Sequence, residues 1–324
     1  MPSYPLATLF RGTVRSEETA DKVRRTFPQH EAKLSFTIVS DIGKPNAFDD
    51  AVKGVDGVIH TASPAQFQVE DNERDLLHPA INGTMNILNS IQKNAPGVKR
   101  VVITSSFASM VDLSKGDWPC HIYNEADWNP MTYEEAAKEN TPGTAAYCAA
   151  KSLAERAAWS FVEHETPRFD VATICPPMVY GPNKNATANL EKLNFSSQDI
   201  YQLMSPMSKP SDPVPENSFW CWVDVRDVAQ AHLRAFELPE AGNQRFFVCK
   251  GNYSFQQIAD ILREHVPEVR DRVPIGKPGG GSLAEIYKTN ASRSEEVLGI
   301  KYHELQQTVV DAAMSLLDLE KTSP

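Results

Sequence analysis

The chain has 324 residues, 41% hydrophobic and 23% charged, which is typical of a globular protein with one large or two ordinary domains. Its net charge of -10 argues against nucleic acid and anionic membrane surfaces as partners. No apolar run approaches the roughly 20 residues of a membrane span. The N-terminus lacks a basic region followed by an apolar stretch, and the five cysteines lack CxxC spacing. We therefore expect a cytoplasmic protein with reduced thiols and no metal site.

Short apolar segments alternate with helical segments along the first two thirds of the chain. The expected strands are Gly12–Arg15, Leu34–Val39, Gly57–His60, Arg100–Ser106 and Phe169–Ile174. The expected helices include Glu17–Arg25, Ala47–Val52, a long one through Asn82–Leu88 and another through Ala145–Glu155. This alternation predicts an α/β fold with a doubly wound parallel sheet.

Polar or turn-forming residues follow the predicted strands. Asp41, Thr61, Ser106 and Pro176 all come where a strand is expected to end. In such sheets, ligands bind beyond the carboxyl ends of the strands. After Gly181 the alternation loosens, and the last third of the chain is expected to be mostly helical.

One helical segment carries a tyrosine and a lysine that share a face. Tyr147 and Lys151 are four residues apart, so their side chains lie one turn from each other. An ammonium group beside a phenol is expected to lower the tyrosine pKa from its ordinary value of about 10. Such a tyrosine exchanges protons with a carbonyl oxygen or a hydroxyl near neutral pH. The same spacing also arises by chance on helix surfaces, so other motifs must decide.

Several further motifs occur in a specific order: Thr104-Ser105-Ser106, Asn124–Trp128, Tyr147-x-x-x-Lys151, Tyr180-Gly181-Pro182 and Asp224–Ala229. With them the sequence resembles the extended short-chain dehydrogenase/reductases from about Gly12 to the C-terminus. Within that superfamily it is most similar to dihydroflavonol reductases, cinnamoyl-CoA reductases and fungal NADPH-dependent methylglyoxal and aldehyde reductases.

The resemblance implies a Rossmann-type fold with two parts. Residues 1–178 and 218–250 would bind the dinucleotide, and residues 179–217 and 251–324 would form a smaller substrate lobe. The implied chemistry is hydride transfer from a nicotinamide to a carbonyl carbon. Ser106 would hydrogen-bond the carbonyl oxygen, Tyr147 would deliver the proton, and Lys151 would hold the ribose hydroxyls. A strand-end hydroxyl that only caps a turn is the alternative for Ser106.

The cofactor is expected to be NADP(H), because Arg15, followed by Lys22, stands where an acidic residue would favour NAD. Alternatively, both are solvated charges beside Arg24 and Arg25. By family position, further cofactor contacts would come from Asp41, Ile42, Thr61, Ala62, Val179 and Ser196. An apolar substrate wall would be formed by Phe67, Phe107 and Met178, for which core packing is the alternative.

One part of the family pattern is missing. Family members begin with a strand, a G-x-x-G-x-x-G turn and a helix that binds the pyrophosphate. The residues before Gly12 contain no glycine. The first βα unit is thus expected to be absent, which would expose two strand edges or force them together. Two explanations for the absent unit are open: the N-terminus is incomplete or alternatively spliced, or the chain is a crippled or repurposed relative of the family.

The leading interpretation is an NADPH-dependent oxidoreductase that reduces a small aldehyde or ketone, as a monomer or homodimer. One alternative is a non-catalytic dinucleotide-binding relative, against which the complete Ser/Tyr/Lys set argues. Another is a nucleotide-sugar epimerase or dehydratase. Residues 182–217 offer few basic groups for a nucleotide diphosphate, chiefly Lys184, Lys192 and Lys209, which favours a small uncharged substrate.

Overall fold

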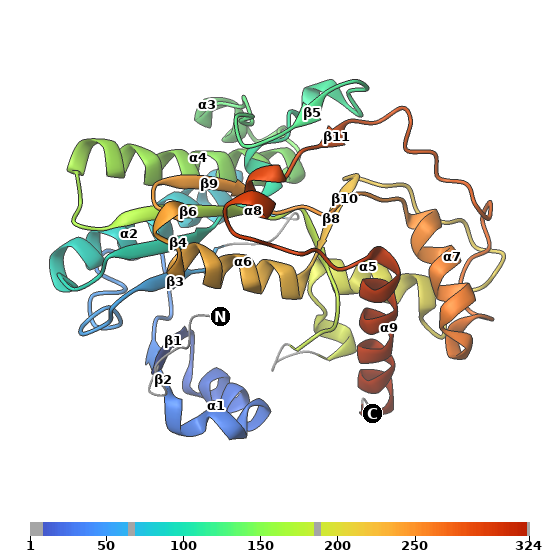
Figure 1. The fold of residues 1–324 in the computed structure, drawn as a ribbon, viewed down its shortest axis with the longest axis horizontal. Helices are drawn as coiled ribbons and strands as arrows, with labels where there is room; N and C mark the ends of the chain where they lie inside the picture. Colours follow the sequence, from blue (N-terminus) through green and yellow to red (C-terminus); the bar gives the residue numbers. More distant parts are fainter. Residues whose placement is uncertain (1–8, 64–68, 185–188, 323–324) are drawn as a thin grey trace.

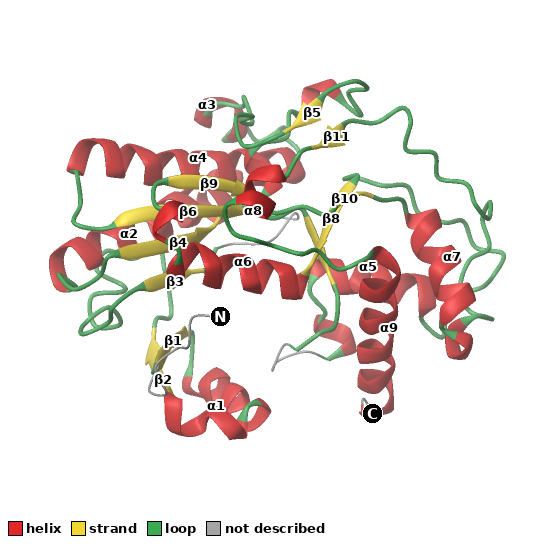
Figure 2. Ribbon diagram, viewed as in Figure 1, coloured by secondary structure: helices red, strands yellow, loops and turns green. Residues whose placement is uncertain are grey.

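A computed structural model describes residues 9–63, 69–184 and 189–322 (Figure 1). Its helices and strands alternate along the chain and then give way to a helical C-terminal part (Figure 2). The strands are β1 Phe10–Val14, β2 Leu34–Ile38, β3 Val58–His60, β4 Arg100–Thr104, β5 Ile122–Tyr123, β6 Asp170–Cys175, β7 Met178–Tyr180, β8 Cys221–Asp224, β9 Gln244–Phe247, β10 Gly251–Asn252 and β11 Lys288–Thr289. The α-helices are α1 Glu17–Thr26, α2 His78–Asn94, α3 Tyr133–Ala136, α4 Gly143–Glu165, α5 Phe195–Met204, α6 Val225–Glu237, α7 Phe255–His265, α8 Ser292–Glu296 and α9 Leu305–Thr322.

The main sheet has four parallel strands in the order β3-β4-β6-β9. Side chains of a strand point alternately to its two faces. Val101 and Ile103 accordingly pack with α2 and α4, whereas Val102 packs on the other face with α6. Both faces are covered, which explains the unbroken β-branched run of β4. The predicted doubly wound parallel sheet is confirmed.

Helix α4 is the longest helix that the structure describes, and it lies beside α2 (Figure 1). Its alanines favour the helix and let it pack closely, since Ala146, Ala149 and Ala158 are all buried. The helix ends at Thr166, which adopts a left-handed conformation with φ of 42° and precedes Pro167. The predicted helix around Tyr147 is confirmed.

β1 and β2 form a separate two-stranded parallel sheet with α1 packed on it (Figure 1). Arg11 ties this unit to the turns of residues 46–54, because its Nη1 atom donates to the carbonyl oxygens of Ala51 and Lys53. Among the described residues, β1 pairs only with β2 and β3 only with β4. Each of these two strands therefore keeps one edge without a strand partner, and Phe10 and Ile59 are 53% and 40% exposed.

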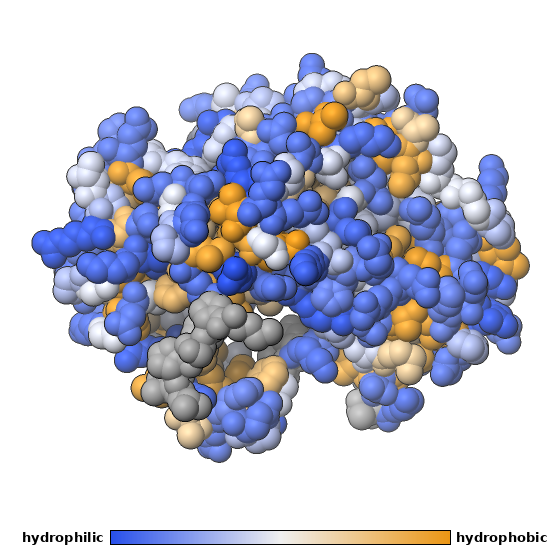
Figure 3. All heavy atoms as spheres, viewed as in Figure 1, coloured by the Kyte–Doolittle hydropathy of each residue, from blue (hydrophilic) through white to orange (hydrophobic). Residues whose placement is uncertain are grey.

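The C-terminal lobe has its own core between α5, α7 and α9. Helix α5 was not expected in the stretch from 182 to 217, which is rich in Pro, Ser and Asn. It forms because Ile200, Leu203 and Met204 recur at helical spacing and are buried against α9. None of the described helices is long and apolar enough to cross a membrane, and polar side chains dominate the face in Figure 3.

The predicted helix Ala47–Val52 is wrong. The segment is a series of turns, with hydrogen bonds such as Asp49 N to Asn46 O and Val52 N to Phe48 O. Asn46 has a left-handed φ of 62°, which interrupts a helix at its start. The run that follows is too short to form a helix without support.

Candidate active site

Ser106 lies two residues beyond the end of β4. It caps a 3-10 turn, because its Oγ accepts the backbone N–H of Ala108 at 3.1 Å. Backbone hydrogen bonds fix the residues on both sides of Ser106. Ser105 N donates to Ile174 O in β6, and Phe107 N donates to the oxygen of Pro176, the residue that follows β6. The side chain of Ser106 is half-buried, so its hydroxyl is held at the sheet edge while part of it stays open.

Helix α4 brings Tyr147 and Lys151 to the same place. The Tyr147 side chain hydrogen-bonds to that of Ser106. Lys151 Nζ lies over the Tyr147 ring, 5.8 Å from its centroid. The structure therefore brings the three predicted catalytic residues together, from the end of one strand and from one face of one helix.

The expected direction of the Tyr147 pKa is wrong. Burial raises the pKa of Tyr147 to about 12, the Cys148 thiol adds to the rise, and the hydrogen bond with Ser106 opposes it. Burial acts more strongly on this phenol than any neighbouring cation. Tyr147 is thus a neutral phenol with a proton to give at neutral pH.

Lys151 and His60 also have shifted pKa values. Burial lowers the pKa of Lys151 to about 8, against the opposing effects of Cys175 and Glu155. Burial and the Lys151 charge together lower the pKa of His60 to about 4. His60 ends β3, and its Nε2 is buried without a hydrogen-bond partner in the described structure. The effect of the Lys151 charge on His60 indicates that the end of β3 lies near the Ser106 and Tyr147 pair.

Three of the predicted cofactor residues lie in the small β1-α1-β2 unit or just after it. Arg15 is exposed one residue beyond β1, and β1 and β2 end together because Val14 pairs with Ile38. Lys22 forms an ion pair with Glu18 at 2.8 Å on α1. Asp41 Oδ1 accepts the backbone N–H of Gly43 at 2.9 Å. Arg15 is thus better placed than Lys22 to meet a phosphate.

The other predicted cofactor residues divide between open and packed positions. Thr61 is exposed and Ala62 half-buried, directly after β3. Ile42 is half-buried, and the absence of a side chain at Gly83 makes room for it. Val179 is half-buried in β7, whereas Ser196 is buried at the start of α5, where its Oγ accepts Asn194 Nδ2 at 3.0 Å.

Two of the three predicted substrate-wall residues, Phe107 and Met178, lie in the described part of the structure. Phe67 lies outside the described residues. Phe107 is 2% exposed, stacked on Phe247 and edge-on to Tyr123, so its ring belongs to the aromatic core behind Ser106. Met178 is half-buried and packs against the core of the C-terminal lobe. Contact of these residues with a substrate stays a prediction.

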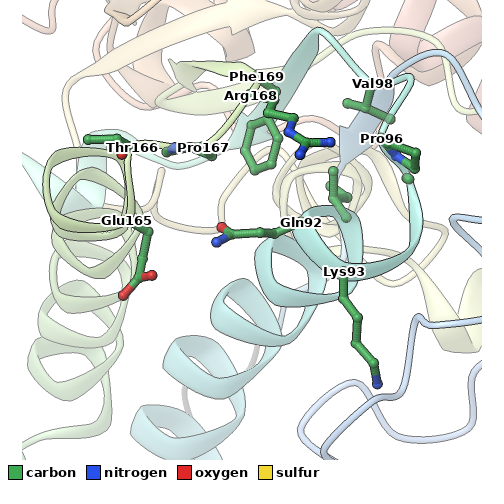
Figure 4. A pocket seen from close by; sticks show the side chains of 11 residues that line it. Gln92, Lys93, Pro96, Val98, Glu165, Thr166, Pro167, Arg168 and Phe169 are labelled. Atoms are coloured by element: carbon green, nitrogen blue, oxygen red, sulfur yellow. The ribbon is translucent and has the colours of Figure 1, made fainter.

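A surface pocket lies away from this site. Its lining includes Gln92, Lys93 and Glu165, at the C-terminal ends of α2 and α4, and Phe169, just before β6 (Figure 4). Tyr147 stands eighteen residues before Glu165 on α4, which at 1.5 Å per residue places them about 27 Å apart along the helix. This pocket therefore takes no part in the chemistry of Ser106 and Tyr147.

Sequence reasoning missed a buried ion pair next to the site. Glu155 lies one turn after Lys151 on α4 and pairs with Arg245 of β9 at 2.8 Å. The signal was present in the sequence, because Arg245 precedes the apolar residues Phe246, Phe247 and Val248. A charge in a strand that is otherwise buried requires a partner.

The parallel sheet with helices on both faces, and the serine, tyrosine and lysine at its edge, define a Rossmann-type enzyme of the short-chain dehydrogenase/reductase kind. Residues 13–249 match the model of the NAD dependent epimerase/dehydratase family, and the chain belongs to that family.

Two curated relatives cover nearly the whole chain. It is 37% identical over 318 residues to the NADPH-dependent methylglyoxal reductase GRE2 of Saccharomyces cerevisiae, covering 95% of this chain and 91% of that protein. It is 40% identical over 312 residues to the ketoreductase azaE of Aspergillus niger, covering 94% and 89%. The crystal structure of yeast methylglyoxal/isovaleraldehyde reductase Gre2 complexed with NADPH superposes with a TM-score of 0.89, at 37% identity, over 96% of this chain and 92% of that one.

Proposed function

We propose that this protein is an NADPH-dependent reductase that converts the carbonyl group of a small aldehyde or ketone into an alcohol. The observation that carries the proposal is the convergence of Ser106, Tyr147 and Lys151 at one sheet edge, with Tyr147 protonated. The named activities of the yeast and Aspergillus relatives, a methylglyoxal reductase and a ketoreductase, support the same chemistry.

The residues present fit the nicotinamide half of the cofactor. Lys151 offers an ammonium, and Thr61, the residue after His60, offers an exposed hydroxyl, which suit ribose hydroxyls and phosphate oxygens. Arg15 offers an exposed guanidinium for a 2′-phosphate. A glycine-rich turn before a helix is not among the described residues. NADPH, when bound, supplies the hydride.

In the proposed mechanism, the substrate carbonyl oxygen lies between the Ser106 hydroxyl and the Tyr147 phenol. Ser106 donates a hydrogen bond that polarises the carbonyl. Tyr147 gives its proton to the oxygen as negative charge develops there, acting as a general acid. Lys151 stays an ammonium at neutral pH and stabilises the tyrosinate left behind.

The test is the loss of NADPH absorbance in the presence of a panel of small carbonyls, for the natural chain and for Tyr147→Phe. We expect turnover by the natural chain and a loss of about 100- to 10,000-fold in the variant, the usual contribution of a general acid. The phenylalanine ring fills the same space, so the thermal melt should change little. An active Tyr147→Phe variant would refute the mechanism.

The remaining assignments extend this proposal. A small-molecule substrate, with neither nucleic acid nor membrane as partner, fits the net charge of -10. A cytoplasmic location fits the five cysteines, which are all free thiols in the structure. For the oligomeric state we propose a monomer or homodimer, which sedimentation would decide.

A further inference from the structure

Glu155 is a charged group in the interior of the protein. It lies on α4, four residues after Lys151 and eight after Tyr147, so the three side chains follow one helical face. The residue is 2% exposed. Although burial opposes ionisation, Arg245 and the surrounding hydroxyl groups hold the pKa of Glu155 below its ordinary value. A carboxylate is therefore kept charged just behind the active site.

One oxygen of this carboxylate is bound to the turn that carries Ser106. Oε2 accepts the Ser105 hydroxyl and the Ser109 hydroxyl, each at 2.6 Å. Ser109 Oγ is also 2.7 Å from the backbone oxygen of Ser106, so its single hydrogen lies between two acceptors. The residues on both sides of Ser106 are thus held by a side chain of the helix that carries Tyr147.

The other oxygen faces the sheet. Oε1 accepts Arg245 Nε and Thr173 Oγ1, both at 2.8 Å. Arg245 is in turn fixed, since its Nη1 donates to the Glu125 oxygen at 3.0 Å and its guanidinium lies over the Trp128 ring at 3.8 Å. Neither the carboxylate nor the guanidinium can move without breaking several buried contacts.

We propose that Glu155 is a positioning residue, which sets the distance between the Ser106 hydroxyl and the Tyr147 phenol by holding Ser105 and Ser109 from the Tyr147 helix. The proposal rests on the carbonyl reduction proposed above. Ser106 comes from a strand end and Tyr147 from a helix, so their separation depends on how these two elements are joined. Hydrogen bonds to a buried charge are short and strong, so this carboxylate holds the Ser106 turn firmly to α4.

The decisive comparison is between two serine variants and a matched control. Replacing Glu155 itself would leave the Arg245 charge buried and alone, which can prevent folding. Ser105→Ala removes one hydroxyl from Oε2, and Ser105→Ala/Ser109→Ala removes both, while the ion pair stays. Thr173→Val removes one hydroxyl from Oε1, on the side away from the Ser106 turn. All three variants are assayed as full chains with NADPH and a carbonyl substrate.

We expect kcat to fall about tenfold in Ser105→Ala and roughly 100-fold in the double variant, as for other small misplacements of reacting groups. The Kd for NADPH and the KM for the carbonyl should stay close to their natural values. Thr173→Val should lower the melting temperature about as much as Ser105→Ala but keep kcat. If the double variant retains kcat, or if Thr173→Val loses as much as Ser105→Ala, the carboxylate is a purely structural group and the proposal is overturned.

Crystal structures of the same variants separate this inference from the proposed function. The proposal requires the Ser106 Oγ to Tyr147 Oη distance to change by more than about 0.5 Å in the double variant and to stay unchanged in Thr173→Val. A natural chain that reduces no carbonyl would refute the proposed function alone, because the structural comparison still decides whether Glu155 sets this distance.

Discussion

Asp199 offers a direct test of how burial changes the pKa of a carboxyl group, and with it the stability of the protein. It lies on α5, is 9% exposed, and accepts the Tyr180 hydroxyl at 3.1 Å, while Tyr180 and Tyr253 share a hydrogen bond of 2.7 Å. Burial raises the pKa of Asp199 from 3.8 to about 6, and the hydrogen bond from Tyr180 only partly opposes it. Asp199→Asn keeps the shape and an acceptor oxygen for Tyr180 but removes the charge.

The magnitude follows from the two pKa values. Between 3.8 and about 6 the folded chain binds a proton that the unfolded chain does not, so the free energy of unfolding falls as pH rises through this range. At ~1.36 kcal/mol per pKa unit the loss amounts to ~3 kcal/mol, which is fully present above pH 6. Asp199→Asn should therefore stabilise the protein at neutral pH by at most ~3 kcal/mol, and the gain should shrink towards zero near pH 4.

The assay is urea denaturation of both proteins at several pH values across this range. Asp49→Asn is the control of opposite sign, because hydrogen bonds from Ser90 and Lys93 lower the pKa of Asp49. That variant should be less stable than the natural chain at neutral pH, with the difference disappearing in acid. A loss of stability in Asp199→Asn at neutral pH that persists unchanged in acid would refute the reasoning.

Two predictions concern the active site. Initial rates measured between about pH 6 and pH 10 should show kcat/KM falling as the pH rises through about 8, because Lys151 loses its ammonium charge there. His60 and Tyr147, with pKa values of about 4 and about 12, do not titrate in this range. If kcat/KM stays constant from about pH 6 to beyond about pH 9, the role given to Lys151 is wrong. Arg15→Ala should weaken NADPH binding about 10- to 100-fold and leave NADH binding unchanged in fluorescence titrations, as expected for a lost charge-assisted hydrogen bond. Lys22→Ala is the matched control and should have little effect, since Lys22 is already paired with Glu18.

The elements that the sequence predicted well are those in which a local pattern and the final packing agree. β4 is a β-branched run with both faces covered, and α4 is rich in alanine and buried over much of its length. Ser106 and Tyr147 could be placed in advance, because one follows a strand and the other lies on a helix. The turns at 46–54 were misjudged, since a single left-handed residue, Asn46, interrupts an otherwise acceptable helical run.

Properties that depend on distant residues could not be predicted. The pKa of Tyr147 is set by how much protein surrounds the phenol, and its spacing from Lys151 says nothing about that. The Glu155 and Arg245 pair joins residues ninety positions apart. The apolar residues after Arg245 indicate that its charge needs a partner, but they do not identify Glu155, and only the packing of β9 on β6 brings Arg245 over α4.

Among the described residues, β1 and β3 each have one edge without a strand partner, which has a consequence for how the protein behaves at high concentration. An open strand edge with exposed apolar side chains, such as Phe10 and Ile59, is a template for a strand from another copy. The net charge of -10 keeps copies apart at low ionic strength. At 0.1 M salt the Debye length shrinks to about 10 Å, and this repulsion no longer reaches between molecules. Added salt should therefore promote the assembly of copies into β-rich aggregates.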